Sequence, residues 1–240
     1  MKKEGCGNKM NLDEVLRRLR ALSNTGNVEG MKRVGISANN TYGVTVPDLR
    51  TMAKTIGKDH LLAQQLWDSQ IHEARILAGM VDEPKMVTEE QMEKWVKDFD
   101  SWDVCDQCCS NLFDKTKFPY QKAVEWSSSN GRSEEFVKRA GFVLMACLAV
   151  HDKKTGDSEF LKFLPIIKSG ATDDRNYVKK AVNWALRQIG KRNISLNEAA
   201  INTAKEIQAT MNSKAAKWVA SDALRELTSK NIQKKLGSSS

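Results

Sequence analysis

Apolar residues recur along most of this chain at the three- and four-residue spacing of one face of an α-helix. Residues 11–23 show the pattern well. Their apolar stripe consists of Leu12, Val15, Leu16, Leu19 and Leu22. Twelve further helices are expected over residues 28–34, 48–56, 59–67, 71–81, 91–99, 102–113, 120–127, 134–150, 159–167, 177–189, 195–211 and 214–228. No stretch alternates apolar and polar positions as a half-buried strand does, so no sheet is predicted.

Several residues signal where helices begin. These are the capping boxes of Thr88 with Gln91 and of Ser195 with Glu198, Ser133 before the long apolar helix, and Pro47 as a first helical residue. Residues 37–46 are rich in turn-forming residues and are the best candidate for a loop.

The predicted helices are joined by short links, and helices joined in this way pack as antiparallel neighbours. A helix pair with its turns takes about 40 residues, in the range of HEAT or armadillo repeats. The sequence therefore predicts an all-α fold, a HEAT-like helical-repeat solenoid or α–α superhelix, in one domain over residues 1–240. Residues 1–10 and 237–240 are expected to be flexible ends.

Composition narrows the classes of partner. The chain has 240 residues, a formal net charge of +8 and a pI of about 9.2. A positive surplus favours polyanions, so DNA, RNA and an acidic membrane surface all qualify. No run approaches 18 apolar residues, and the N-terminal MKKEGCGNKM has no apolar core of a signal peptide. A cytoplasmic protein, associated with the nucleoid in a bacterium, is expected.

The cysteines do not indicate a metal site. There are five, an odd number: Cys6, Cys105, Cys108, Cys109 and Cys147. Cys105 and Cys108 have ligand spacing, but no second pair or histidine lies where a structural zinc needs its other ligands. Reduced thiols acting as small buried side chains are the better interpretation, and neither a metal nor a cofactor is expected.

The stretch YVKKAVNWALRQIGKR, residues 177–192, has two faces. The core face is expected to hold Val178, Ala181, Val182, Ala185 and Ile189, and the other face Tyr177, Lys180, Trp184, Arg187 and Lys191. A tryptophan among cations is typical of a nucleic-acid surface. The alternative is that Trp184 packs against a neighbouring helix and the lysines are only solvated.

A second stretch, DSWDVCDQCCSNLF at residues 100–113, places Trp102 and Asp106 four residues apart, on one helical face. A carboxylate beside an indole can hold a cation. Asp103 is expected to cap this helix, whereas Asp106 lies too far into it to act as a cap. The buried stripe is predicted to hold Cys105, Cys108 and Leu112.

Lys138 and Arg139 interrupt the most apolar stretch, EEFVKRAGFVLMACLAV at residues 134–150. A buried arginine needs an anionic partner. Either it pairs with a carboxylate of the neighbouring helix, or it faces a groove and meets phosphate. The pattern does not decide whether Lys138 or Arg139 would face such a groove.

Taken together, these stretches resemble the AlkD-like DNA alkylation repair proteins, a family of HEAT-repeat DNA glycosylases. The shared residues are Trp102-Asp103-x-x-Asp106, Lys138-Arg139-Ala140, Lys179-Lys180-Ala181 with Trp184-Ala185-Leu186-Arg187, and Tyr42-Gly43-Val44 with Pro47 and Arg50. The resemblance covers about residues 28–225. Unlike the well-studied branch of the family, residues 31–34 (MKRV) contain no tyrosine.

The resemblance implies a concave basic face that cradles DNA and hydrolyses the N-glycosidic bond of cationic N3- or N7-alkylated purines. Asp106 would be the catalytic carboxylate, Trp102 and Trp184 the aromatic walls, and Arg139 a contact to the backbone or to Asp106. The expected contacts to DNA are Lys138, Lys179, Lys180, Arg187 and Lys191. The implied partner is double-stranded DNA with alkylated bases, with no membrane and no obligate protein partner. A non-catalytic DNA- or RNA-binding module and a protein-binding scaffold are the alternatives.

Overall fold

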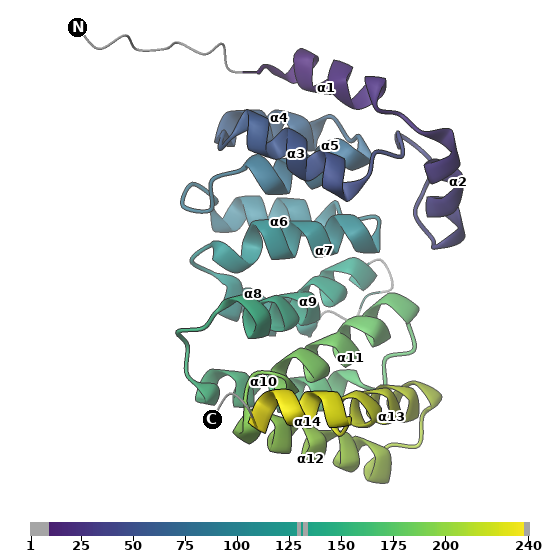
Figure 1. Cartoon of the computed structure of the whole chain (residues 1–240), viewed down its shortest axis with the longest axis vertical. Coiled ribbons are helices and arrows are strands. Elements are labelled where there is room, and N and C mark those ends of the chain that lie inside the picture. Colours follow the sequence, from purple (N-terminus) through teal and green to yellow (C-terminus); the bar gives the residue numbers. More distant parts are fainter. Residues whose placement is uncertain (1–9, 129–130, 132–133, 238–240) are drawn as a thin grey trace, which may run out of the picture. The chain divides into compact units, whose positions relative to one another are not determined.

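The computed structural model describes residues 10–128, 131 and 134–237 and divides the chain into two compact units, Met1–Val87 and Thr88–Ser240. Within the described residues every regular element is a helix, which confirms the all-α prediction (Figure 1). The first unit contains α1 (Leu12–Ala21), α2 (Thr25–Arg33), α3 (Val46–Ile56), α4 (His60–Asp68) and α5 (His72–Val81). The second contains α6 (Glu89–Lys97), α7 (Trp102–Asn111), η1 (Phe113–Lys115), α8 (Pro119–Ser127), α9 (Glu135–His151), α10 (Asp157–Gly170), α11 (Asn176–Gly190), α12 (Ile194–Thr210), α13 (Lys214–Leu227) and α14 (Lys230–Gly237).

Side chains cap many of the helix starts. The capping residues, each accepting a backbone N–H of the first turn, include Asn11, Asn24, Thr45, Asp59, Thr88, Asn193 and Ser213. The prediction for Thr88 is therefore confirmed. The prediction for Ser195 is wrong, because Asn193 is the N-cap of α12 and the helix begins at Ile194. Pro47 is the second helical residue, and Ser133 lies outside the described residues.

In the first unit, a buried carboxylate holds the predicted loop between α2 and α3. Glu73 on α5 accepts hydrogen bonds from the backbone N–H groups of Tyr42, Gly43 and Val44, at 2.6–3.3 Å. Gly43 has φ +76°, and a Cβ there would lie 2.3 Å from the carbonyl oxygen of Asn24. The glycine and the carboxylate together fix this turn, in the segment that carries part of the family resemblance.

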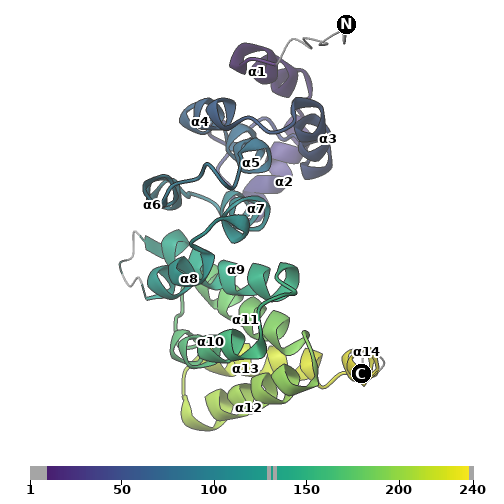
Figure 2. The ribbon, with the colours of Figure 1, turned by 90° about the vertical axis from the view of Figure 1, so that its left-hand side faces the viewer.

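The second unit is built from four helix pairs: α6 with α7, α8 with α9, α10 with α11, and α12 with α13. Figure 2 shows α6, α8 and α10 on one side of this unit and α7, α9 and α11 on the other. The predicted hairpins of helices are therefore present. The structure also contains α14, which the sequence pattern did not predict.

We call α7, α9, α11 and α13 the inner layer of this unit, and α6, α8 and α10 the outer layer. Successive helices of the inner layer run parallel to one another. Cys105 and Cys109 of α7 point their thiols at the carbonyls of Phe136 and Ala140 of α9, so that both helices advance together. The same relation joins α9 to α11 and α11 to α13. Neighbouring helices of this layer contact one another through side chains, as Glu135 of α9 accepts from the N–H of Tyr177 on α11 and Asn183 of α11 donates to the carbonyl of Val219 on α13.

The two layers approach closely where α8 meets α9. A Cβ on Gly141 of α9 would lie 2.4 Å from the backbone nitrogen of Ser127 and 2.8 Å from its Cα. Only glycine permits this approach, which places α9 directly against α8. Because α9 carries Lys138 and Arg139, this contact helps set the position of the candidate site.

No helix in the described part of the chain is long and apolar enough to cross a membrane. The expectation of a single domain over residues 1–240 stays a prediction, as do the flexible ends.

Candidate nucleic-acid interface

Asp106 of α7 and Arg139 of α9 form a bidentate ion pair. Arg139 Nε donates to Asp106 Oδ1 at 2.9 Å, and Nη2 donates to Oδ2 at 2.7 Å. The remaining nitrogen, Nη1, donates to the backbone carbonyl of Tyr177 on α11 at 2.6 Å. Arg139 thus joins three consecutive inner helices. Of the two partners proposed for Arg139, the carboxylate of a neighbouring helix is the one that the structure shows.

The pair is largely buried, with side-chain exposures of 16% for Asp106 and 7% for Arg139. Burial raises the pKa of the Asp106 carboxyl, and the attraction and hydrogen bonds of Arg139 offset only part of that rise. Burial alone would lower the pKa of Arg139, but the charge and hydrogen bonds of Asp106 outweigh burial and raise it. The result is a fixed carboxylate that is more basic than an exposed aspartate, beside a guanidinium that stays charged.

The surroundings of Asp106 follow from the helical repeat of α7. Cys105, Cys108 and Leu112 are fully buried, as the sequence predicted. Trp102 lies one turn before Asp106 and is half-buried. The first-turn residue Asp103 accepts a hydrogen bond from the N–H of Val104 at 3.0 Å. However, the N-cap position belongs to Ser101, so the expectation that Asp103 caps α7 is wrong.

Trp184 is on α11, seven residues after Tyr177 and therefore about 10 Å further along that helix. It is half-buried. When the Gln188 amide is turned so that its oxygen faces these donors, that oxygen accepts hydrogen bonds from Trp184 Nε1 at 2.9 Å and from Lys191 Nζ at 3.3 Å. The structure therefore brings Asp106 and Arg139 into contact and places Trp102 on the same helix as Asp106. Trp184 lies about two turns along α11 from Tyr177, whose carbonyl Arg139 contacts.

The predicted basic residues differ in their surroundings. Lys138 is buried and pairs with Asp173 at 3.1 Å, so neither it nor Arg139 points freely into a groove. Lys180 is exposed on α11. Lys179 lies over the ring of Trp218 on α13, with Nζ 5.2 Å from the ring centroid.

Arg187 and Lys191 contact acidic residues on α13. Arg187 Nη1 donates to Glu226, and Lys191 Nζ lies 2.6 Å from the other oxygen of the same carboxylate. Asp222 lies 3.8 Å from Arg187 Nε. The sequence pattern did not point to these carboxylates, although Asp222 and Glu226 are four residues apart on one helical face. Two of the predicted phosphate contacts are thus partly neutralised within the protein.

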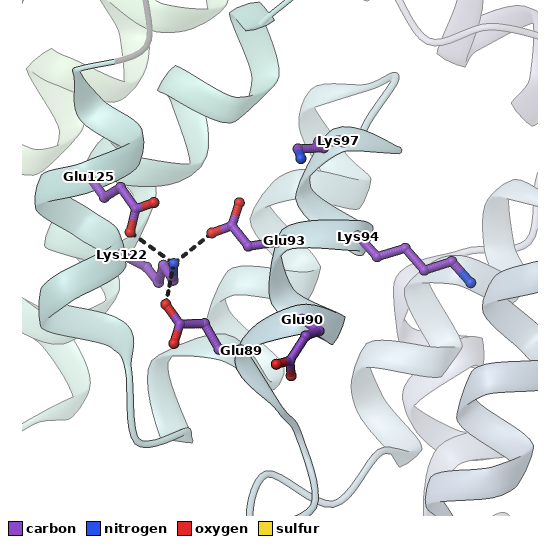
Figure 3. Close-up of a pocket in the computed structure, with 7 residues that line it drawn as sticks. All are labelled: Glu89, Glu90, Glu93, Lys94, Lys97, Lys122 and Glu125. Atoms are coloured by element: carbon purple, nitrogen blue, oxygen red, sulfur yellow. Dashed lines mark hydrogen bonds and ion pairs between the residues drawn. The ribbon is translucent and has the colours of Figure 1, made fainter.

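A pocket of about 620 Å³ lies elsewhere, between α6 and α8 of the outer layer. Its lining residues are Glu89, Glu90, Glu93, Lys94, Lys97, Lys122 and Glu125. Lys122 is 2% exposed, and its Nζ lies 2.7–2.8 Å from Glu89, Glu93 and Glu125 (Figure 3). Although burial lowers the pKa of Lys122, the three carboxylates outweigh this and raise it. The cluster ties α6 to α8 and is separate from the inner helices.

Comparisons with known proteins show the fold and the family of this chain. No protein of curated function matches the chain. A solved structure described as "A new family of proteins related to the HEAT-like repeat DNA glycosylases with affinity for branched DNA structures" matches with a TM-score of 0.74 and 20% identity. The match covers 90% of this chain and 95% of the other. That likeness confirms the HEAT-like repeat fold.

The family model described as "DNA alkylation repair enzyme" matches residues 15–227. This range runs from within α1 to the end of α13 and includes every residue proposed for the site. The chain therefore belongs to the DNA alkylation repair enzyme family.

Proposed function

We propose that this protein is a DNA glycosylase that removes cationic N3- or N7-alkylated purines, with Asp106 as its catalytic carboxylate. The proposal rests on the Asp106 carboxylate, which Arg139 holds in place and whose pKa is raised by burial. It rests equally on the membership of the chain in the DNA alkylation repair family. Each oxygen of Asp106 accepts one hydrogen bond from Arg139. A carboxylate has about four acceptor positions, so further positions exist for a water molecule.

An alkylated purine that carries a positive charge is a good leaving group without a general acid. The bond from C1′ of the sugar to the base nitrogen breaks, and its electron pair neutralises the departing base. Positive charge develops on the sugar as this happens, and an anion nearby stabilises it. The oxygen of a water molecule then bonds to C1′, and the water's proton passes to Asp106. A raised pKa makes Asp106 a better acceptor of that proton.

The test is release of 7-methylguanine or 3-methyladenine from methylated DNA, measured for the wild type and Asp106→Asn. The variant keeps the shape of the side chain, and its release rate should fall about a thousandfold, equivalent to about 4 kcal/mol. Asp174→Asn, at an exposed position of the same unit, makes the same change in net charge and should retain full activity. Equal rates for Asp106→Asn and the wild type would exclude the proposed role. Absence of release by folded wild type would exclude the activity.

A second candidate is a DNA-binding protein that recognises structure without cutting a bond. The ion pair favours it, because Arg139 partly neutralises the one carboxylate that the chemistry needs. The matched structure is itself described as having affinity for branched DNA. This candidate predicts salt-sensitive DNA binding, no base release, and the same affinity for Asp106→Asn as for the wild type.

A further inference from the structure

Trp218 is the most exposed tryptophan in the described chain. Its relative exposure is 40%, whereas Trp67, Trp95 and Trp126 are buried and the other two indoles are half-buried. Tryptophan rarely lies so open on a surface without a partner, since its large apolar area favours burial. It lies on α13, the last helix of the inner layer.

One lysine contacts this indole, and further lysines lie on the two helices that meet there. Lys179 Nζ lies 5.2 Å from the ring centroid, and Lys180, Lys214 and Lys217 are exposed on the same two helices. Lys214 and Trp218 are four residues apart and share a face of α13. The nearest acidic residue along that face, Asp222, is one turn further and is engaged by Arg187 and Arg225. We call Trp218 with these four lysines the Trp218 platform.

The combination of an open indole and concentrated positive charge selects a ligand that offers both flat rings and phosphates. Single-stranded nucleic acid has this character, because unpaired bases stack on aromatic side chains while lysines contact the backbone. Bases inside a duplex are stacked on one another and cannot reach the indole. A phospholipid surface supplies the charge without the rings.

We propose that the Trp218 platform binds an unpaired nucleotide of DNA at a point where the two strands separate. This inference rests on the proposed DNA-directed function and assigns it a structural preference. The inner helices place the platform three helix spacings from Asp106 on α7, or about 24–30 Å at 8–10 Å per spacing. A strand that follows the layer would span this distance with about seven to nine nucleotides.

The experiment measures the affinity of the full chain for three DNAs of equal length by fluorescence anisotropy: a duplex, a duplex with an unpaired flap, and single-stranded oligo(dT). Trp218→Ala should weaken binding of the flap and oligo(dT) by roughly 5- to 150-fold, the effect of losing one base stack. Duplex binding should change less than about threefold. Trp218→Tyr keeps an aromatic ring and should retain most of the affinity. Leu161→Ala removes another exposed apolar side chain, 42% exposed on the outer helix α10, and should change nothing.

The outcomes separate the two proposals. If the wild type binds none of the DNAs, the DNA-directed function fails, and the platform fails with it. If the wild type binds and Trp218→Ala binds all three DNAs equally well, only the platform is overturned. An equal loss for duplex and flap would also overturn it, because that loss would reflect backbone contacts alone. Base release from methylated duplex should be unaffected by Trp218→Ala.

Discussion

The approach of α8 to α9 leads to a prediction that is independent of any ligand. Replacing Gly141 by alanine would place a Cβ 2.4 Å from the backbone nitrogen of Ser127, 2.8 Å from its Cα and 2.9 Å from the carbonyl carbon of Trp126. Ordinary contact begins near 3.4 Å, so the two helices must separate by about 1 Å at this point. Backbone atoms cannot move aside as a flexible side chain can.

Overpacking of this kind costs about 1–3 kcal/mol, and a contact with backbone belongs at the upper end. Alanine gains about 1 kcal/mol over glycine from its helix propensity. The net loss for Gly141→Ala should be about 2 kcal/mol, which corresponds to a fall in Tm of about 4–8 °C for a chain of this size.

Thermal and urea unfolding, followed by circular dichroism, would measure this loss. Gly156→Ala is the matched control in the same unit. No atom lies within 4 Å of its added Cβ, and its φ of −70° suits any residue. Because Gly156 is the N-cap of α10, where alanine is less favourable than glycine, this control should lose only about 0.5–1 kcal/mol, less than Gly141→Ala. A Tm for Gly141→Ala equal to or above that of the wild type would refute the described contact between α8 and α9.

Two further predictions concern charge. Glu226→Gln removes the carboxylate that engages Arg187 and Lys191, so the variant should bind DNA more tightly, and the slope of log affinity against log salt should steepen by up to about 2. Anisotropy titrations across salt concentrations would measure this, and an unchanged slope would show that these cations do not reach phosphate. Burial favours a high pKa for Asp173, but hydrogen bonds, first of all from Arg175, outweigh it and hold the pKa at about 2. A depressed pKa stabilises the fold above the unfolded value near 4, and this stabilisation is lost as the pH falls towards 2. Asp173→Asn should therefore have a lower free energy of unfolding than the wild type at pH 7. It should also lose less of that free energy between pH 4 and pH 2, as measured by urea unfolding. Parallel curves of unfolding free energy against pH would contradict this.

Helical periodicity predicted most of the fold, because each helix buries one stripe of side chains that is visible in the sequence. Errors occurred where local signals were weak or duplicated. Residues 230–237 bury only Leu236, too little for a recognisable stripe. Asn193 and Ser195 are both good N-caps, and the structure uses Asn193, whose amide also donates to Asp157 at 2.9–3.0 Å. That tertiary contact leaves no mark on the local pattern.

The candidate site was only partly predictable for a related reason. The sequence indicated that Arg139 needs an anionic partner, but choosing Asp106 required the register between α7 and α9. Likewise, the cationic face of α11 was visible as a pattern, whereas its neutralisation by Glu226 depends on how α13 lies beside it. Contacts between helices depend on packing geometry, which the spacing of residues within one helix does not specify.

The three-helix contact of Arg139 also bears on how the protein opens. In a helical-repeat protein each repeat is stabilised by its neighbours, and the ends fray first. Fraying from the carboxyl end would have to pass α14, α13 and α12 before it reached the carbonyl of Tyr177 on α11. Asp106 and Arg139 are therefore shielded from terminal fluctuations by the helices beyond them. Their backbone amides should exchange with solvent only when several helices unfold together. The geometry of the pair therefore persists while the terminal helices open and close.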